Sequence, residues 1–209
     1  MFDRREFFQA GLALAAAEKY RPGDLTGEFV RHMVTSGKAK LRSPVSRADV
    51  VAYETTYGVR FSRSFKSFLR VSNGLELSYD FEEVRAAGLS VGYADINVIF
   101  GIGGDHPHSD LVKLTRIWEF YDVKFLSFAP AIALGGDFCT LSEISRGKHT
   151  GRIMYTDGEN FSEFQKRDIK GRSPDDLVDE FIRDGWFMPI ADSFELLLAN
   201  YATIGNNAI

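Results

Sequence analysis

Two histidines and an aspartate occur within one short run of the sequence, at Asp105, His106 and His108. Imidazole nitrogens and a carboxylate oxygen are ligands that zinc binds, and alternate residues of an extended segment point to the same side. A catalytic zinc centre needs a further ligand, and the other two histidines are distant in the sequence. We therefore interpret the run as a solvent-exposed loop, and a metal-dependent hydrolase that uses these three residues is the alternative.

Other patterns typical of catalysis are incomplete. The glycines at Gly101, Gly103 and Gly104 lack the spacing of a dinucleotide fingerprint, and no Lys-Ser or Lys-Thr pair of a P-loop follows them. The spacing Gly-x-Ser-x-Gly occurs at Gly88, Ser90 and Gly92, but the strand before it and the helix after it that a nucleophile elbow requires are not expected there. The single cysteine, Cys139, excludes an intramolecular disulfide and is expected to be a buried, inert thiol. The sequence therefore predicts no catalytic residue, no metal and no cofactor.

Acidic and aromatic residues gather in predicted loops and strand ends. These are the candidate partner-binding residues: Glu76, Tyr79, Asp80, Phe81, Glu82, Glu83, Tyr93, Asp157 and Glu159. Carboxylates that cluster in space would attract a basic partner and speed association, while the aromatic rings would carry much of the affinity. A solvated rim without a partner is the alternative for each acid.

Composition limits the classes of function. The chain has 209 residues, a net charge of −4, 44% hydrophobic residues and 26% charged residues, which is typical of one globular domain with extensions. Nucleic-acid binding is not expected, because neutralising phosphates requires clustered Lys and Arg. A mildly acidic surface suits a basic protein partner. No apolar run approaches the roughly 20 residues that cross a bilayer, so no membrane contact is expected.

The N-terminal segment begins like a twin-arginine export signal, with Arg4 and Arg5 before an Ala/Leu-rich stretch. That apolar stretch is only about eight residues long, at the short limit for a signal core. We prefer a short amphipathic helix and a cytoplasmic protein, with export as the alternative. Residues 1–44 are thus predicted to form an N-terminal helical extension.

Capping and periodicity predict the elements that position these segments. Helices are expected to begin after Asp24, Ser46, Ser62, Ser173 and Asp192. In the helix after Ser62, the side chains of Phe65, Phe68 and Leu69 form one apolar face. Strands are expected within Leu75–Leu77, Asn97–Ile102, Phe125–Leu134, Phe138–Glu143 and Gly151–Tyr155. Together they predict a single α+β domain with a twisted, mostly antiparallel sheet and helices packed on one face.

The segment Tyr53–Gly74 reads YETTYGVRFSRSFKSFLRVSNG. It resembles the signature of the SUKH superfamily, the Smi/Knr-like proteins: a Glu-ending helix, a Gly-containing link, a Leu-Pro step, an aromatic-rich helix and a closing Asn-Gly. Phe61-Ser62 stands where the family has Leu-Pro. Further motifs similar to the family's occur in its order, within 97–102, 111–118, 128–141, 151–155 and 193–197. The resemblance extends over about Val45 to Tyr201, so residues 45–209 are assigned to a SUKH-like domain.

The resemblance implies binding without catalysis. We expect an immunity protein that binds and neutralises a cognate toxin by occlusion, with a basic toxin domain as the partner. An intracellular regulatory scaffold of the Smi/Knr kind is the alternative within the same family. The oligomeric state is left open.

Overall fold

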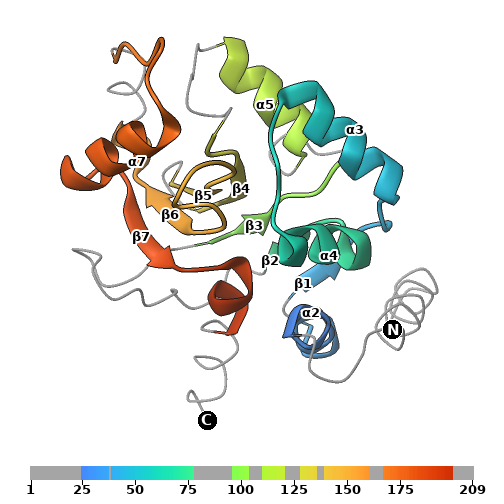
Figure 1. Ribbon diagram of the computed structural model, residues 1–209. Helices are drawn as coiled ribbons and strands as arrows, with labels where there is room; N and C mark the ends of the chain where they lie inside the picture. Colours follow the sequence, from blue (N-terminus) through green and yellow to red (C-terminus); the bar gives the residue numbers. More distant parts are fainter. Residues whose placement is uncertain are drawn as a thin grey trace.

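The computed structural model (Figure 1) describes residues 25–37, 39–77, 96–103, 110–120, 128–135, 139–160 and 167–199. The elements in chain order are α2 (Leu25–Thr35), β1 (Ala39–Leu41), α3 (Arg47–Tyr57), α4 (Arg63–Ser72), β2 (Leu75–Leu77), β3 (Val98–Ile99), α5 (Leu111–Phe120), β4 (Ala131–Leu134), β5 (Thr140–Glu143), β6 (Ile153–Thr156), the 3-10 turn η4 (Gly158–Asn160), α7 (Pro174–Arg183) and β7 (Met188–Ala191). A further helical turn lies at 194–199.

The strands form one antiparallel sheet in which each strand pairs with the next along the chain (Figure 1). Ile99 of β3 lies opposite Leu75 of β2 and Ala133 of β4, and Ala133 in turn lies opposite Leu141 of β5. Side chains at such paired positions share one face of the sheet. The predicted α+β architecture, a single antiparallel sheet with helices packed against it, is confirmed.

The main core lies between this face and the helices. Phe65, Phe68 and Leu69 of α4 have no exposed surface and belong to one cluster with Leu75 of β2. The ring of Phe194 packs edge-on against Phe65 and Phe68, with centroids 5.0 Å and 5.3 Å away. The predicted packing of the apolar face of α4 against the sheet is therefore confirmed.

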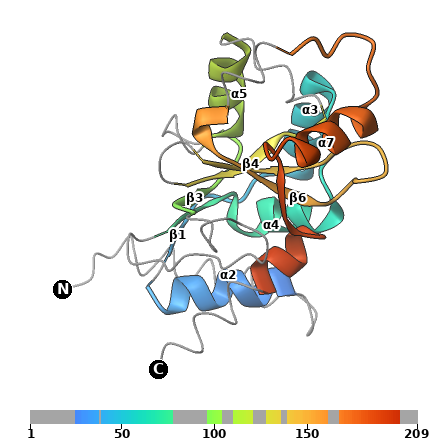
Figure 2. The same ribbon diagram turned by 90° about the vertical axis from the view of Figure 1, so that its left-hand side faces the viewer.

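Helix α7 packs against β6 in a second, smaller hydrophobic cluster. Met154 alternates in direction with Ile153 and Tyr155, and it packs with Phe181 of α7 and with Phe187. Figure 2 shows α7 above the strands and α2 with the 194–199 turn below them. Helices therefore cover both faces of the sheet at β6, whereas the sequence predicted helices on one face only.

Local capping explains where the helices begin. The side chains of Ser46, Ser62 and Ser173 each accept the backbone N–H of the residue three positions later, as predicted.

The sequence did not predict two of the short strands, β1 and β7. Within the described ranges, no helix is long and apolar enough to cross a bilayer.

Two glycine-containing motifs that are distant in the sequence, Asn73-Gly74 and Gly101-Ile102, are in close contact at the C-terminus of α4. The side chain of Asn73 accepts the N–H of Ile102 at 2.7 Å and donates to its carbonyl at 3.0 Å. A Cβ on Gly101 would lie only 1.9 Å from the carbonyl oxygen of Asn73, and a Cβ on Gly74 would lie 2.7 Å from the nitrogen of Gly101. Only glycine allows the backbones to approach this closely. These contacts hold the C-terminus of α4 against the segment that follows β3.

Candidate functional site

The link between α3 and α4, residues 58–62, is held by two carboxylates. The N–H of Phe61 donates to Oε1 of Glu54 at 2.8 Å, and the N–H of Ser62 donates to both carboxylate oxygens of Glu143 at 3.2 Å. Nζ of Lys66 lies 3.2 Å from the same Oε1 of Glu54. Consecutive backbone donors are therefore bound by side chains from α3 and from β5.

The shape of the link follows from its ends. Helix α3 ends at Gly58, whose φ of 63° lies in the left-handed region that glycine adopts without strain. Helix α4 begins with Ser62, whose hydroxyl accepts the N–H of Phe65 at 3.1 Å. The N–H of Val59 still donates to the carbonyl of Glu54 in α3, but the N–H groups of Phe61 and Ser62 lie beyond that helix and need side-chain acceptors. Glu54 and Glu143 supply them.

Glu143 is a buried acid with an altered proton affinity. It has no exposed surface, and burial raises the pKa of its carboxyl from 4.5 to about 7, against the lowering effects of the hydrogen bonds from Ser62 and the charge of Lys66. The neighbouring charge of Glu54 raises this pKa as well. Near neutral pH the folded protein therefore contains Glu143 in both protonation states.

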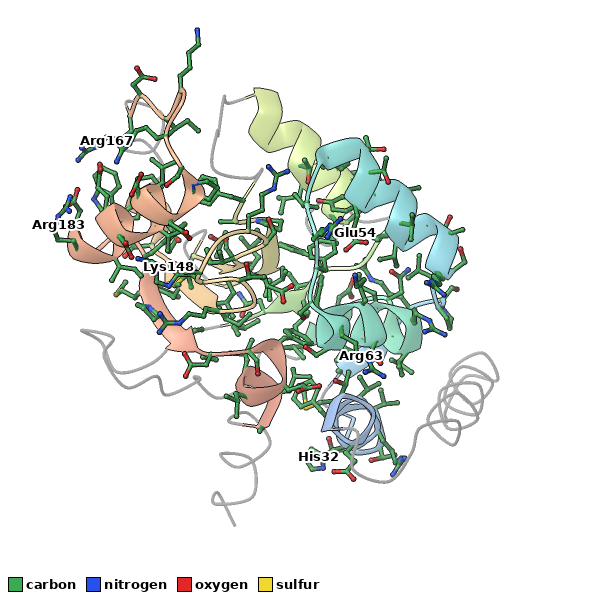
Figure 3. All side chains as sticks on the ribbon, in the orientation of Figure 1. His32, Glu54, Arg63, Lys148, Arg167 and Arg183 are labelled. Carbon is green, nitrogen blue, oxygen red and sulfur yellow. The ribbon has the colours of Figure 1, made fainter. Side chains whose placement is uncertain are left out.

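An open pocket of about 660 Å³ lies beside the link. Its lining residues come from α3, from the link and from the segment after β5: Val51, Glu54, Thr55, Gly58, Val59, Arg60, Ser145 and Arg146. The guanidinium of Arg146 donates to the carbonyl of Gly58 and so joins the segment after β5 to the C-terminus of α3. Figure 3 shows Glu54 on the side of α3 that faces the link.

The lining of this pocket is suited to binding. The guanidinium of Arg60 is exposed and has no hydrogen-bond or ion-pair partner among the described residues. Oε1 of Glu54 is occupied, whereas its Oε2 has no hydrogen-bond partner among those residues. Val51 adds an apolar wall that is 48% exposed. Glu143 is inaccessible to any ligand in this conformation, so its part in the site is to position the link.

The predicted acidic rim is only partly described. Glu76 lies in β2, where its Oε1 pairs with Nη2 of Arg42 at 3.0 Å, and Asp157 directly follows β6. Three strands separate them, which at the usual strand spacing corresponds to roughly 19 Å. The backbone of Glu159 lies in η4. Asp157 and the backbone of Glu159 are therefore not brought together with Glu76 into one cluster.

The other candidate residues lie outside the described ranges. They are Tyr79, Asp80, Phe81, Glu82, Glu83 and Tyr93 of the predicted rim, and Asp105, His106 and His108 of the alternative hydrolase. Among the described residues, no group of three or more His, Cys, Asp or Glu side chains is arranged to hold a metal ion. Nε2 of His149 lies 2.8 Å from Oδ1 of Asp179, which joins the turn after β5 to α7.

Sequence reasoning placed Glu143 in a strand but did not select it as a site residue. A signal existed: Glu143 is two residues after Leu141, so in a strand the two side chains point to the same, buried face. An acid at such a position needs a partner. That the partner is the N–H of Ser62, 81 residues away along the chain, has no counterpart in any local pattern.

No known protein-family model matches the chain, and no curated protein is significantly similar to it in sequence. The SUKH resemblance accordingly stays a prediction.

Proposed function

We propose that this chain is a protein-binding domain that neutralises a cognate toxin by covering its surface. The observation that supports the proposal most directly is the combination of a fixed link with an open pocket beside it. Both ends of the link are capped, its backbone donors are bound by Glu54 and Glu143, and the adjoining side of α3 is exposed. A preorganised surface loses little conformational entropy on association, which favours affinity.

The resemblance described above supplies the second support. Its segment Tyr53–Gly74 is the part of the chain that forms this link, and its closing Asn73-Gly74 is bonded to another of its motifs, Gly101-Ile102. Residues far apart in the sequence thus serve one structural unit. The proposal takes from the family only the role of binding and occlusion.

The direct test is a titration of toxin activity with the full-length protein. Candidate toxin domains encoded beside the gene would be assayed with increasing amounts of the protein. Occlusion consumes one protein molecule for each toxin molecule, so activity should reach its minimum at equimolar protein. Complete inactivation by a small fraction of that amount would mean catalytic turnover and would support the hydrolase alternative. No inhibition, despite a stable complex, would favour the regulatory scaffold.

A further inference from the structure

The α3–α4 unit has a charge opposite to that of the whole chain. Residues 45–74 contain two acids, Asp49 and Glu54, and five basic residues: Arg47, Arg60, Arg63, Lys66 and Arg70. Their net charge is therefore +3, whereas the whole chain has −4. The remainder of the molecule accordingly holds the acidic excess.

Two basic residues line the pocket, Arg60 of this unit and Arg146 of the segment after β5. Arg60 has no partner among the described residues. A guanidinium without a carboxylate partner is a donor fork that matches a carboxylate or a phosphate. The pocket therefore favours an anionic group over a cationic one.

One exposed stripe of α3 beside the pocket carries no charged side chain. Ala48, Val51, Ala52 and Thr55 follow the i, i+3, i+4, i+7 spacing of one helix face, and all four are exposed. Val51 and Thr55 also line the pocket. A ligand at this place could therefore make apolar contacts with the uncharged helix face and ion pairs with the arginines of the pocket.

We infer that the pocket and the uncharged face of α3, called here the α3 surface, dock an acidic segment of a partner protein. A carboxylate of that segment pairs with Arg60 and Arg146, and a small apolar side chain packs on Val51. Oε2 of Glu54 then accepts an N–H or O–H of the partner. Glu54 therefore favours a ligand with a donor beside its anionic group, which a peptide offers through its backbone N–H groups and a phosphodiester group does not. The inference rests on the proposed function and names its contact surface and the charge of the partner's segment.

The first test uses a library of random short peptides displayed on phage, selected against the immobilised full-length protein. Enriched peptides should carry Asp or Glu next to an aliphatic residue. Their affinity should fall about tenfold or more with Arg60→Glu and with Val51→Asp, the loss typical of a residue at the centre of an interface. Both side chains are exposed, so the variants should melt at the wild-type temperature.

Arg183→Glu is the matched control. It makes the same change in net charge on α7, far from α3 in Figure 3, at a side chain that is 71% exposed. Peptide affinity should stay at the wild-type value. The inference is overturned by an equal loss with Arg183→Glu, by enriched peptides that lack acids, or by a library that yields no enrichment. Displacement of the peptide by a single-stranded oligonucleotide, lost with Arg60→Glu, would also overturn it in favour of a nucleic-acid ligand.

The toxin titration separates this inference from the proposed function. If a toxin is inhibited at equimolar protein but Arg60→Glu inhibits equally well, the α3 surface is wrong and the proposed function stands. If Asp157→Lys weakens that inhibition and Arg60→Glu does not, the contact lies around Asp157 at the end of β6. If no toxin is inhibited while acidic peptides bind the α3 surface, the proposed function fails and the surface stands.

Discussion

Replacing Glu143 with Gln should remove most of the pH dependence of folding stability on the acidic side of neutrality. Burial raises the pKa of Glu143 in the folded protein from 4.5 to about 7. Between these values the folded protein holds a proton that the unfolded chain has released, so the free energy of unfolding falls as the pH rises. Above the folded-state pKa both states are ionised and the fall ends.

The size of this effect follows from the two pKa values. Each unit of difference corresponds to about 1.4 kcal/mol, so the free energy of unfolding should fall by about 3 kcal/mol from the lower pKa to the upper one. The amide of Gln keeps an oxygen that can accept the N–H of Ser62, but it does not titrate. The variant should therefore fold and should lack this fall.

Urea unfolding at about pH 5 and about pH 8, followed by tryptophan fluorescence and circular dichroism, measures the difference. Other groups that titrate in this window contribute to both proteins and cancel when the wild type and Glu143→Gln are compared. Glu195→Gln removes an exposed carboxylate and should retain the wild-type pH dependence. If Glu143→Gln loses as much stability between the two pH values as the wild type, the carboxyl is not protonated in the folded state. The reasoning from burial would then be refuted.

Three further outcomes are expected. Phe68→Ala should lower the free energy of unfolding by about 3–5 kcal/mol, because the ring is fully buried, whereas exposed Val51→Ala should change it by less than about 0.5 kcal/mol in the same denaturant titration. Gly101→Ala should lower the free energy of unfolding by about 3 kcal/mol or more, because the new Cβ meets backbone atoms of Asn73. At the control position Gly37, nothing lies within 4 Å but φ is 72°, so Gly37→Ala should lower it by roughly 1–2 kcal/mol. Wild-type stability of Gly101→Ala would contradict the close approach of the two motifs. Protein purified without a histidine tag should contain no stoichiometric zinc by elemental analysis, and zinc that disappears when both histidines of segment 105–108 are changed to Ala would promote the hydrolase alternative.

The predictions that succeeded from the sequence depend on neighbouring residues. The capping box of Ser46 and Asp49 forms as expected, and Asn73 ends α4 in the left-handed conformation. Short strands gave weaker signals: β1 has three residues, and β7 contains Pro189, which lacks the N–H that a strand residue normally donates. The strand predicted at Asn97–Ile102 is shorter, Val98–Ile99, because Gly101 and Ile102 instead serve the contact with Asn73.

The sequence by itself determined the α+β class, the helix starts and the apolar face of α4, because each depends on residues no more than a few positions apart. Only the tertiary structure decided which acid holds the link, that Gly101 must accommodate Asn73, and that Arg60 and Arg146 line one pocket. These contacts join residues that are 28 to 86 positions apart by their numbers, where local propensity has no influence. They depend instead on the register of the sheet, which sets which residues lie side by side, and on burial, which requires each buried polar group to find a hydrogen-bond partner.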